Sequence, residues 1–329
     1  MKIFRSACAA LFAVVGVGLC LTSVAVAEQA SKSAKDMALI GDAVCTKCHD
    51  ETEDYPVLAI AKTRHGVIAD SRNPRCTSCH GDSSEHAKKG SDRNRPKPDI
   101  TYRDTQTAVP VGERIEHDLG YSLTPVAERN EACLACHKGG KRMHWQGSTH
   151  DARNVACTSC HQIHTGHDRV RDKRAQSELC FSCHKQQRIQ VNRPSHHPLR
   201  EGKMGCSDCH NVHGSIFPKQ LVRDNVNDTC YQCHMEKRGP FVRTHQPVQE
   251  DCSICHNPHG SISANLLKAR SPWICQQCHE PNGHRGRLGN IFGTSTRANA
   301  AARGCLNCHT NIHGTNNPAN ISNDRTFRR

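Results

Sequence analysis

Every cysteine after Cys20 belongs to one short motif, Cys-x-x-Cys-His, which occurs ten times in the 329 residues. The ten first cysteines are Cys45, Cys76, Cys133, Cys157, Cys180, Cys206, Cys230, Cys252, Cys275 and Cys305. The ten second cysteines are Cys48, Cys79, Cys136, Cys160, Cys183, Cys209, Cys233, Cys255, Cys278 and Cys308. The histidines that follow are His49, His80, His137, His161, His184, His210, His234, His256, His279 and His309. A chain that fixes so many reactive side chains at one spacing must fold around whatever they bind.

This motif is the attachment signature of haem c. Two thiols add to the two vinyl groups at one porphyrin edge, and the adjacent histidine reaches the iron as its proximal ligand. Disulfides require neither a two-residue gap nor a following histidine. Structural zinc would need two cysteine pairs per metal, and a thioredoxin-like pair occurs once, in a βαβ unit. The sequence therefore predicts ten covalently bound haem c groups.

Each iron needs a sixth ligand, and 14 histidines lie outside the motifs. Methionine cannot serve generally, because only four occur after residue 27. Two axial imidazoles per iron are therefore predicted, which gives a lower potential than His/Met ligation. The predicted distal ligands are His65, His86, His150, His164, His197, His213, His245, His259, His284 and His313. His117, His144, His167 and His196 are left over as surface histidines or propionate partners, and the choice between His196 and His197 is close.

The distal candidates alternate in position. A histidine follows the even-numbered motifs within three to six residues, whereas the odd-numbered motifs have one further on. This alternation predicts five two-haem modules. Their approximate ranges are 45–87, 133–165, 180–214, 230–260 and 275–314, with an inserted polar loop at 88–130. Neighbourhood assigns each distal histidine to its own motif, although a ligand can also come from elsewhere in the chain.

Composition supports an interior made of cofactor. Aromatic residues are 4% of the chain, and the hydrophobic share is 36% even with the cysteines included. Aliphatic side chains cannot supply the core expected for this length. We expect a multihaem cytochrome c fold, in which loops and short α-helices wrap ten haems with almost no β-sheet and an elongated outline. A helix is expected in the run that begins at Lys185.

The N-terminus resembles a secretory signal peptide over residues 1–27. Lys2 and Arg5 precede an apolar run, and Ala25-Val26-Ala27 forms a small-residue cleavage site. Residues 28–329, the predicted decahaem domain, carry 42 basic and 31 acidic residues, a net charge of +11. Twenty haem propionates would bring the reduced protein to about −9, so the basic residues mainly offset cofactor charge and no nucleic-acid partner is predicted.

Function follows from ligation. An iron held by two histidines can gain or lose an electron but has no open position for a substrate. The first hypothesis is an electron-transfer protein with no catalytic residues. The alternatives are a soluble periplasmic electron carrier or store and, less favoured, a multihaem reductase with one open haem, although all ten proximal positions are histidine.

Several phrases resemble the periplasmic decahaem cytochromes of porin–cytochrome conduits, the MtrA, MtoA and PioA type with DmsE-like relatives. They are Asn-x-His-Gly-Ser at 211–215 and 257–261, Lys-Arg-Met-His-Trp at 141–145, and Asn-Asp-Thr-Cys at 227–230. The resemblance covers essentially the whole chain after the predicted signal peptide. It departs mainly before Cys45 and in the insertion after His86.

The resemblance implies a place and partners. Such proteins lie in the periplasm and occupy the lumen of an outer-membrane β-barrel, through which electrons cross the membrane. The implied partners are this porin-like barrel, periplasmic or inner-membrane c-type cytochromes and, in some systems, an outer-surface multihaem cytochrome. Extracellular electron transfer to Fe(III) minerals and electron uptake by Fe(II) oxidation both stay open, because a conductor works in either direction.

Overall fold

A computed structural model describes residues 42–50, 56–67, 70–88, 96–102, 124–279, 304–307 and 309–316. The predicted signal peptide, most of the inserted loop, His117, Cys308 and His284 lie outside the described residues. The chain divides into two compact units. The described parts of the first unit fall within 42–102, 124–136 and 156–168, and those of the second within 137–155 and 169–316.

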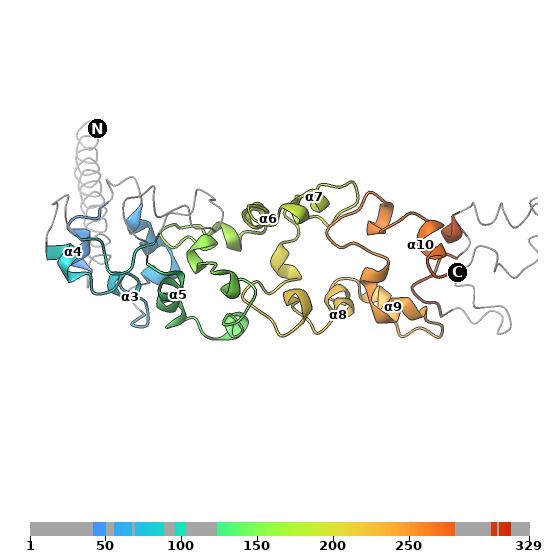
Figure 1. The fold of residues 1–329 in the computed structure, drawn as a ribbon, viewed down its shortest axis with the longest axis horizontal. Coiled ribbons are helices and arrows are strands. Elements are labelled where there is room, and N and C mark those ends of the chain that lie inside the picture. The colour runs from blue at the N-terminus through green and yellow to red at the C-terminus, as the bar shows by residue number, and fades with distance from the viewer. Residues whose placement is uncertain are drawn as a thin grey trace, which may run out of the picture. The chain divides into compact units, whose positions relative to one another are not determined.

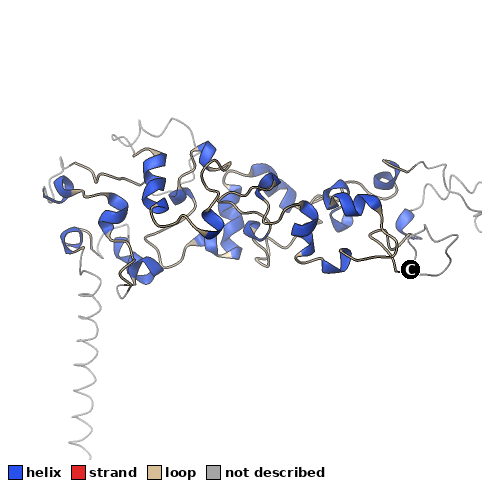
Figure 2. Cartoon of the chain, turned by 90° about the horizontal axis from the view of Figure 1, so that it is seen from below, coloured by secondary structure: helices blue, strands red, loops and turns tan. Residues whose placement is uncertain are grey.

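Short helices and loops make up the described part of the chain, which contains no β-strand (Figure 2). The α-helices are α2 (Ala43–Thr46), α3 (Cys76–His80), α4 (Ser84–Lys88), α5 (Val126–Leu134), α6 (Lys173–Phe181), α7 (Lys185–Val191), α8 (Val226–Tyr231), α9 (Gln246–Glu250) and α10 (Trp273–Gln276). The 3-10 turns are η1 (Val57–Lys62), η2 (Arg64–Gly66), η3 (Gly140–Arg142), η4 (Asp151–Arg153), η5 (Cys157–Ser159), η6 (Arg169–Arg171), η7 (Cys206–Asp208), η8 (Pro218–Gln220), η9 (Met235–Lys237), η10 (Cys252–Ile254), η11 (Ala264–Leu266) and η13 (Cys305–Asn307).

The predicted fold class is confirmed in its local structure. The helix expected from Lys185 is α7, and the described residues of the second unit contain four isolated β-bridges. None of the described helices is both long and apolar enough to cross a lipid bilayer. Within the second unit, helices α6 to α10 follow one another in chain order along the molecule (Figure 1). The elongated outline of the whole chain stays a prediction.

The two kinds of motif occupy two kinds of local structure. Each odd-numbered motif has its first cysteine in the last turn of an α-helix, which is α2, α5, α6, α8 or α10. Side chains cap two of these helices, because Asp172 accepts the N–H of Arg174 before α6 and Asn225 accepts that of Asp228 before α8. Among the even-numbered motifs, four begin in a 3-10 turn and the motif at Cys76 forms α3.

One side chain joins the two motifs of each predicted module, and we name these five residues the module clamp. Each lies three or four residues before an odd-numbered motif and accepts a backbone N–H at the start of the next motif. The bonds run from Cys76 to Asp42 Oδ1 (3.1 Å), from Cys157 to Asn130 Oδ1 (2.8 Å), from Ser207 to Gln176 Oε1 (3.0 Å), from Cys252 to Asn227 Oδ1 (2.7 Å) and from Cys305 to Ser271 Oγ (3.0 Å). The clamp thus satisfies the N-terminal donor of each even-numbered turn.

Apolar packing is thin. Only six hydrophobic side chains are buried among the described residues, and the one core cluster joins Phe181, Val191 and Leu199 around α6 and α7, with Met204 beside it. Several clamp residues are themselves buried polar groups, among them Asn130 and Asn227. A protein interior is normally filled to close packing, so a further group must complete this one.

Replacing a clamp residue should destabilise the fold. Asn227→Ala leaves the N–H of Cys252 without its acceptor and removes two bonds that Asn227 donates to α9, at the carbonyls of Val248 and Gln249. We expect the free energy of unfolding to fall by about 1–3 kcal/mol and the Tm to fall with it.

The matched control is Asn192→Ala, which removes an exposed amide that contacts only the carbonyl of Arg188. Its effect should stay within about 0.5 kcal/mol. Thermal unfolding followed by circular dichroism measures both variants, and equal Tm values for the two would contradict a structural role for the clamp.

Candidate haem-binding sites

The structure brings seven motif histidines opposite seven of the predicted distal histidines. The ring-centroid distances are 6.1 Å for His49–His86, 6.3 Å for His80–His164, 6.1 Å for His184–His150, 6.1 Å for His210–His259, 6.3 Å for His234–His197, 6.0 Å for His256–His313 and 6.1 Å for His279–His245. These distances lie within 0.3 Å of one another although the pairs come from different parts of the chain.

A separation of this size fits one iron atom between two imidazoles. A metal–imidazole bond of about 2.0–2.1 Å, with about 1.1 Å from the ligating nitrogen to the ring centre, places two ligated rings about 6.2–6.4 Å apart. Aromatic rings in contact have centroids anywhere from about 4.5 to 7 Å apart, so the indicative feature is that one narrow distance recurs in seven pairs. The paired donors therefore fit a six-coordinate haem with a histidine on each face.

The pairs do not follow neighbourhood. His164, His259 and His313 lie just after the fourth, eighth and tenth motifs, yet they face the second, sixth and eighth. The distal candidates His150, His197 and His245 instead face a motif further along the chain, the fifth, seventh and ninth. Three residues span at most about 10 Å, which is too short for the chain to pass from one face of a porphyrin to the other. A distal histidine three residues after a motif must therefore serve another one.

Hydrogen bonds at Nδ1 orient these rings. The distal side chains His150, His164 and His197 donate to the carbonyls of Val212, Val57 and Pro258 at 2.9, 2.8 and 2.7 Å. A donor bond at Nδ1 leaves the lone pair on Nε2, the atom that would then bind a metal.

Proximal histidines also donate from Nδ1 to backbone carbonyls. His80, His210 and His256 donate to the carbonyls of Ile100, Lys219 and Asn265 at 3.0, 2.9 and 2.7 Å. Lys219 and Asn265 both have a left-handed φ of 56°. This strained turn recurs in two modules and presents its carbonyl to the proximal ring, so its cost is offset locally.

Burial favours the neutral, ligating form of five of the paired imidazoles. Burial is the largest cause that lowers the pKa of His80, His184, His245 and His259, and neighbouring imidazoles lower each of them further. Burial and the nearby Lys237 ammonium lower the pKa of His313 to about 4.

A tight turn, Asn-x-His-Gly, supplies one distal ligand and orients another. In the copy at 257–260, His259 faces His210 while the carbonyl of Pro258 accepts the Nδ1–H of His197. Gly260 has a φ of +147°, and a Cβ atom there would lie 2.0 Å from the carbonyl oxygen of Gln190. Only glycine permits this approach, so the turn ties two neighbouring sites together.

Cysteines of successive motifs are also neighbours. Within each module the first cysteines meet, as in the thiol contacts of Cys133 with Cys157 and of Cys230 with Cys252, and this contact raises the pKa of Cys133 and of Cys230. Burial raises the pKa of Cys76 to about 12. No described cysteine forms a disulfide.

Between modules, the second cysteine of an even-numbered motif lies near the second cysteine of the next odd-numbered motif. Burial is the largest cause that raises the pKa of Cys255 and of Cys209. The neighbouring Cys278 thiol raises the pKa of Cys255 further, and the neighbouring Cys233 thiol raises that of Cys209. Attachment points therefore follow sequence order within each unit.

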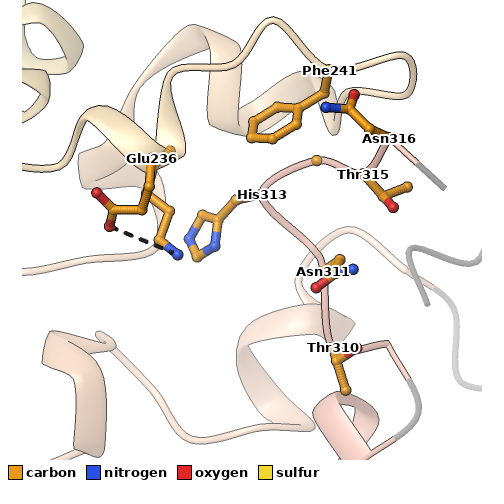
Figure 3. A pocket seen from close by; sticks show the side chains of 9 residues that line it. Glu236, Phe241, Thr310, Asn311, His313, Thr315 and Asn316 are labelled. Atoms are coloured by element: carbon orange, nitrogen blue, oxygen red, sulfur yellow. Dashed lines mark ion pairs between the residues drawn. The ribbon is translucent and has the colours of Figure 1, made fainter. Parts of the chain in front are cut away.

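Figure 3 shows the surroundings of one distal candidate. His313 lies beside a cavity of about 300 Å³ that is also lined by Phe241 and by the Glu236–Lys237 ion pair. A Cβ on Gly314 would lie 2.2 Å from the Phe241 ring, so glycine is needed for that ring to cover the turn. Lys237 brings a positive charge beside His313.

The pairing of six further predicted ligands stays a prediction. The structure describes His65 in η2, His137, His161, His213 and His309, whereas His284 lies outside the described residues. Sequence reasoning also missed two buried donors, Trp145 Nε1 and Arg129 Nε, which have no hydrogen-bond partner among the described residues. Such donors suit the propionate carboxylates of a haem. Trp145 lies in a phrase already noted, whereas Arg129 carries no sequence signal.

Known proteins share this organisation. The chain is 42% identical over 285 residues to the protein named multiheme cytochrome MtrA of Shewanella baltica, which covers 84% of this chain and 78% of that protein. The chain belongs to the MtrA family of multihaem cytochromes.

Two family models also match this MtrA-family chain. The doubled CXXCH motif matches residues 196–239 and 245–284, and the NrfB-like c-type cytochrome model matches residues 76–175. The chain is 28% identical over 164 residues to the cytochrome c-type protein NrfB of Haemophilus influenzae, covering 44% of this chain and 64% of that protein. The chain is thus a multihaem electron-transfer cytochrome with covalently bound haem c, not an enzyme.

Adjacent histidines test the distal assignment in this MtrA-family cytochrome. His197 faces His234, whereas His196 donates from Nδ1 to the carbonyl of Arg193 and has Nε2 3.4 Å from Glu201. His197→Ala should open one iron and give one high-spin centre that binds carbon monoxide when reduced.

The neighbouring substitution His196→Ala is the control and should leave every centre low-spin. Absorption and magnetic circular dichroism spectra distinguish the two variants. A carbon monoxide adduct in His196→Ala but none in His197→Ala would reverse the assignment.

Proposed function

We propose that the chain is a decahaem conductor, with ten haem c groups each held by one Cys-x-x-Cys-His motif and one distal histidine. Each haem iron, when bound, cycles between ferric and ferrous states and so holds one electron. The chain's own part is to attach the porphyrins by two thioethers, close both axial positions and exclude substrate. The proposed ligand set is the motif histidines together with the ten distal candidates named from the sequence.

The repeated 6.0–6.3 Å imidazole pairing carries this proposal. Two histidines at that distance leave no coordination position open, and seven sites share it. An open haem, which a nitrite or sulfur-oxyanion reductase needs, would require a site without a distal histidine. The geometry therefore favours electron transfer without bond chemistry.

The order of the sites supports conduction. First cysteines meet within a module and second cysteines lie close between modules, so consecutive attachment edges are neighbours along each unit. The module clamp and the Asn-x-His-Gly turns hold these neighbours at fixed spacing. The five-module division of residues 28–329 is part of the proposal.

We place the cytochrome in the periplasm, within an outer-membrane porin-like barrel. Membership of the MtrA family and the signal-peptide-like residues 1–27 support this location. A chain rich in polar loops can cross a hydrocarbon layer only inside a polar-lined lumen. Periplasmic or inner-membrane c-type cytochromes would exchange electrons with it on one side. An outer-surface multihaem cytochrome or soluble iron would do so on the other, for Fe(III) reduction or Fe(II) oxidation.

Reconstitution tests the conduit. The cytochrome should copurify with a barrel protein, and liposomes that contain both should oxidise enclosed reduced methyl viologen when ferric citrate is added outside. Liposomes with the barrel alone, or with the cytochrome alone, are the controls and should show no oxidation. A cytochrome found only in the soluble fraction, with no transmembrane oxidation, would contradict the conduit and favour a periplasmic carrier.

A further inference from the structure

The proximal histidine of the fourth motif has an unusual hydrogen-bond partner. Nδ1 of His161 donates to a carboxylate oxygen, Asp168 Oδ2, at 2.8 Å. The other carboxylate oxygen, Oδ1, accepts the backbone N–H of Gln162 at 3.3 Å. The carboxylate is therefore held at both oxygens, and its position toward the ring is fixed by the loop that follows the motif.

Other proximal histidines meet a neutral acceptor at the same ring atom. His80, His210 and His256 donate to backbone carbonyls at 2.7–3.0 Å. The bond at His161 has a similar length but brings a full negative charge. Since the side chains of His161 and Asp168 are only 33% and 17% exposed, solvent screens this charge weakly.

A second carboxylate provides an internal comparison. Glu236 Oε1 lies 3.6 Å from Nδ1 of His234, beyond hydrogen-bond distance, and the two side chains are 60% and 54% exposed. The ammonium of Lys237 lies 3.9 Å from the same oxygen (Figure 3). The longer distance, the exposure to water and the Lys237 ammonium all weaken the effect of the Glu236 carboxylate on the His234 ring.

A carboxylate at Nδ1 pulls the ring proton toward itself and makes Nε2 a more electron-rich ligand. Such a ligand stabilises ferric iron more than ferrous iron, because the ferric state carries one more positive charge. Second-shell hydrogen bonding of this kind is a known determinant of haem potential.

We propose that Asp168 is a positioning residue that lowers the reduction potential of the haem attached to Cys157 and Cys160. The inference rests on the proposed haem ligation by His161. Asp168 makes reduction of this haem less favourable than it would be if Nδ1 of His161 donated to a neutral hydrogen-bond acceptor. Asp168 therefore biases a partly reduced protein toward holding its electrons at other sites.

The test is a potentiometric titration of the full-length holoprotein, monitored by absorption and electron paramagnetic resonance. Asp168→Asn keeps a hydrogen-bond acceptor of the same size but removes the charge. It should raise the potential of one centre by about 59 mV or more, a tenfold change in its electron affinity. Asp168→Ser, also neutral, should shift the same centre in the same direction.

Glu236→Gln is the matched control and should change the affinity of the His234 centre less than threefold. Haem content and low-spin spectra, measured on the same samples, distinguish a failure of the proposed ligation from a failure of the proposed role of Asp168. A missing haem or a high-spin centre in the wild type would overturn the ligation. Full haem content, low-spin spectra and an unchanged titration in Asp168→Asn would overturn the role of Asp168 alone.

Discussion

Paired imidazoles, held apart by the distance that two axial ligands of one iron would take, are the constraint on which the described fold depends. The described chain buries only six hydrophobic side chains and has no strand, so apolar packing between protein elements cannot hold it together. Histidine pairs 6.0–6.3 Å apart bring together segments separated by tens of residues, such as His80 with His164. Haem attachment thereby replaces both the core and the long-range contacts of an ordinary globule.

Local devices make this coordination specific. Backbone carbonyls at Nδ1 choose the tautomer, and left-handed residues such as Lys219 present those carbonyls. The Asn-x-His-Gly turn links the orientation of His197 to the placement of His259, so neighbouring sites are not independent. The module clamp then joins odd- and even-numbered motifs. Spacing between carriers is in this way a property of the backbone, which suits a conductor better than flexible side-chain contacts would.

Much of the site could be predicted from sequence because covalent attachment has a strict local pattern. The Cys-x-x-Cys-His motifs, the seven distal candidates that lie opposite a motif histidine and the scarcity of sheet in the described residues were all predicted. The pairing could not be predicted, since His164 lies opposite His80, more than eighty residues earlier, and only the folded chain shows this. Asp168 lies seven residues after His161 with no periodic signal. Asn130 and Asn227 each lie three residues before a motif, so an alignment of the repeats could have identified these two clamp residues from the sequence.

The most direct test of the central claim is a count of low-spin ferric centres with two imidazole ligands in the purified cytochrome. Near-infrared magnetic circular dichroism, calibrated against total haem, measures this number. The account predicts ten per chain, with no methionine-ligated or high-spin component. A substantially smaller number, or several centres that bind carbon monoxide in the reduced wild-type protein, would contradict an interior built on paired histidines.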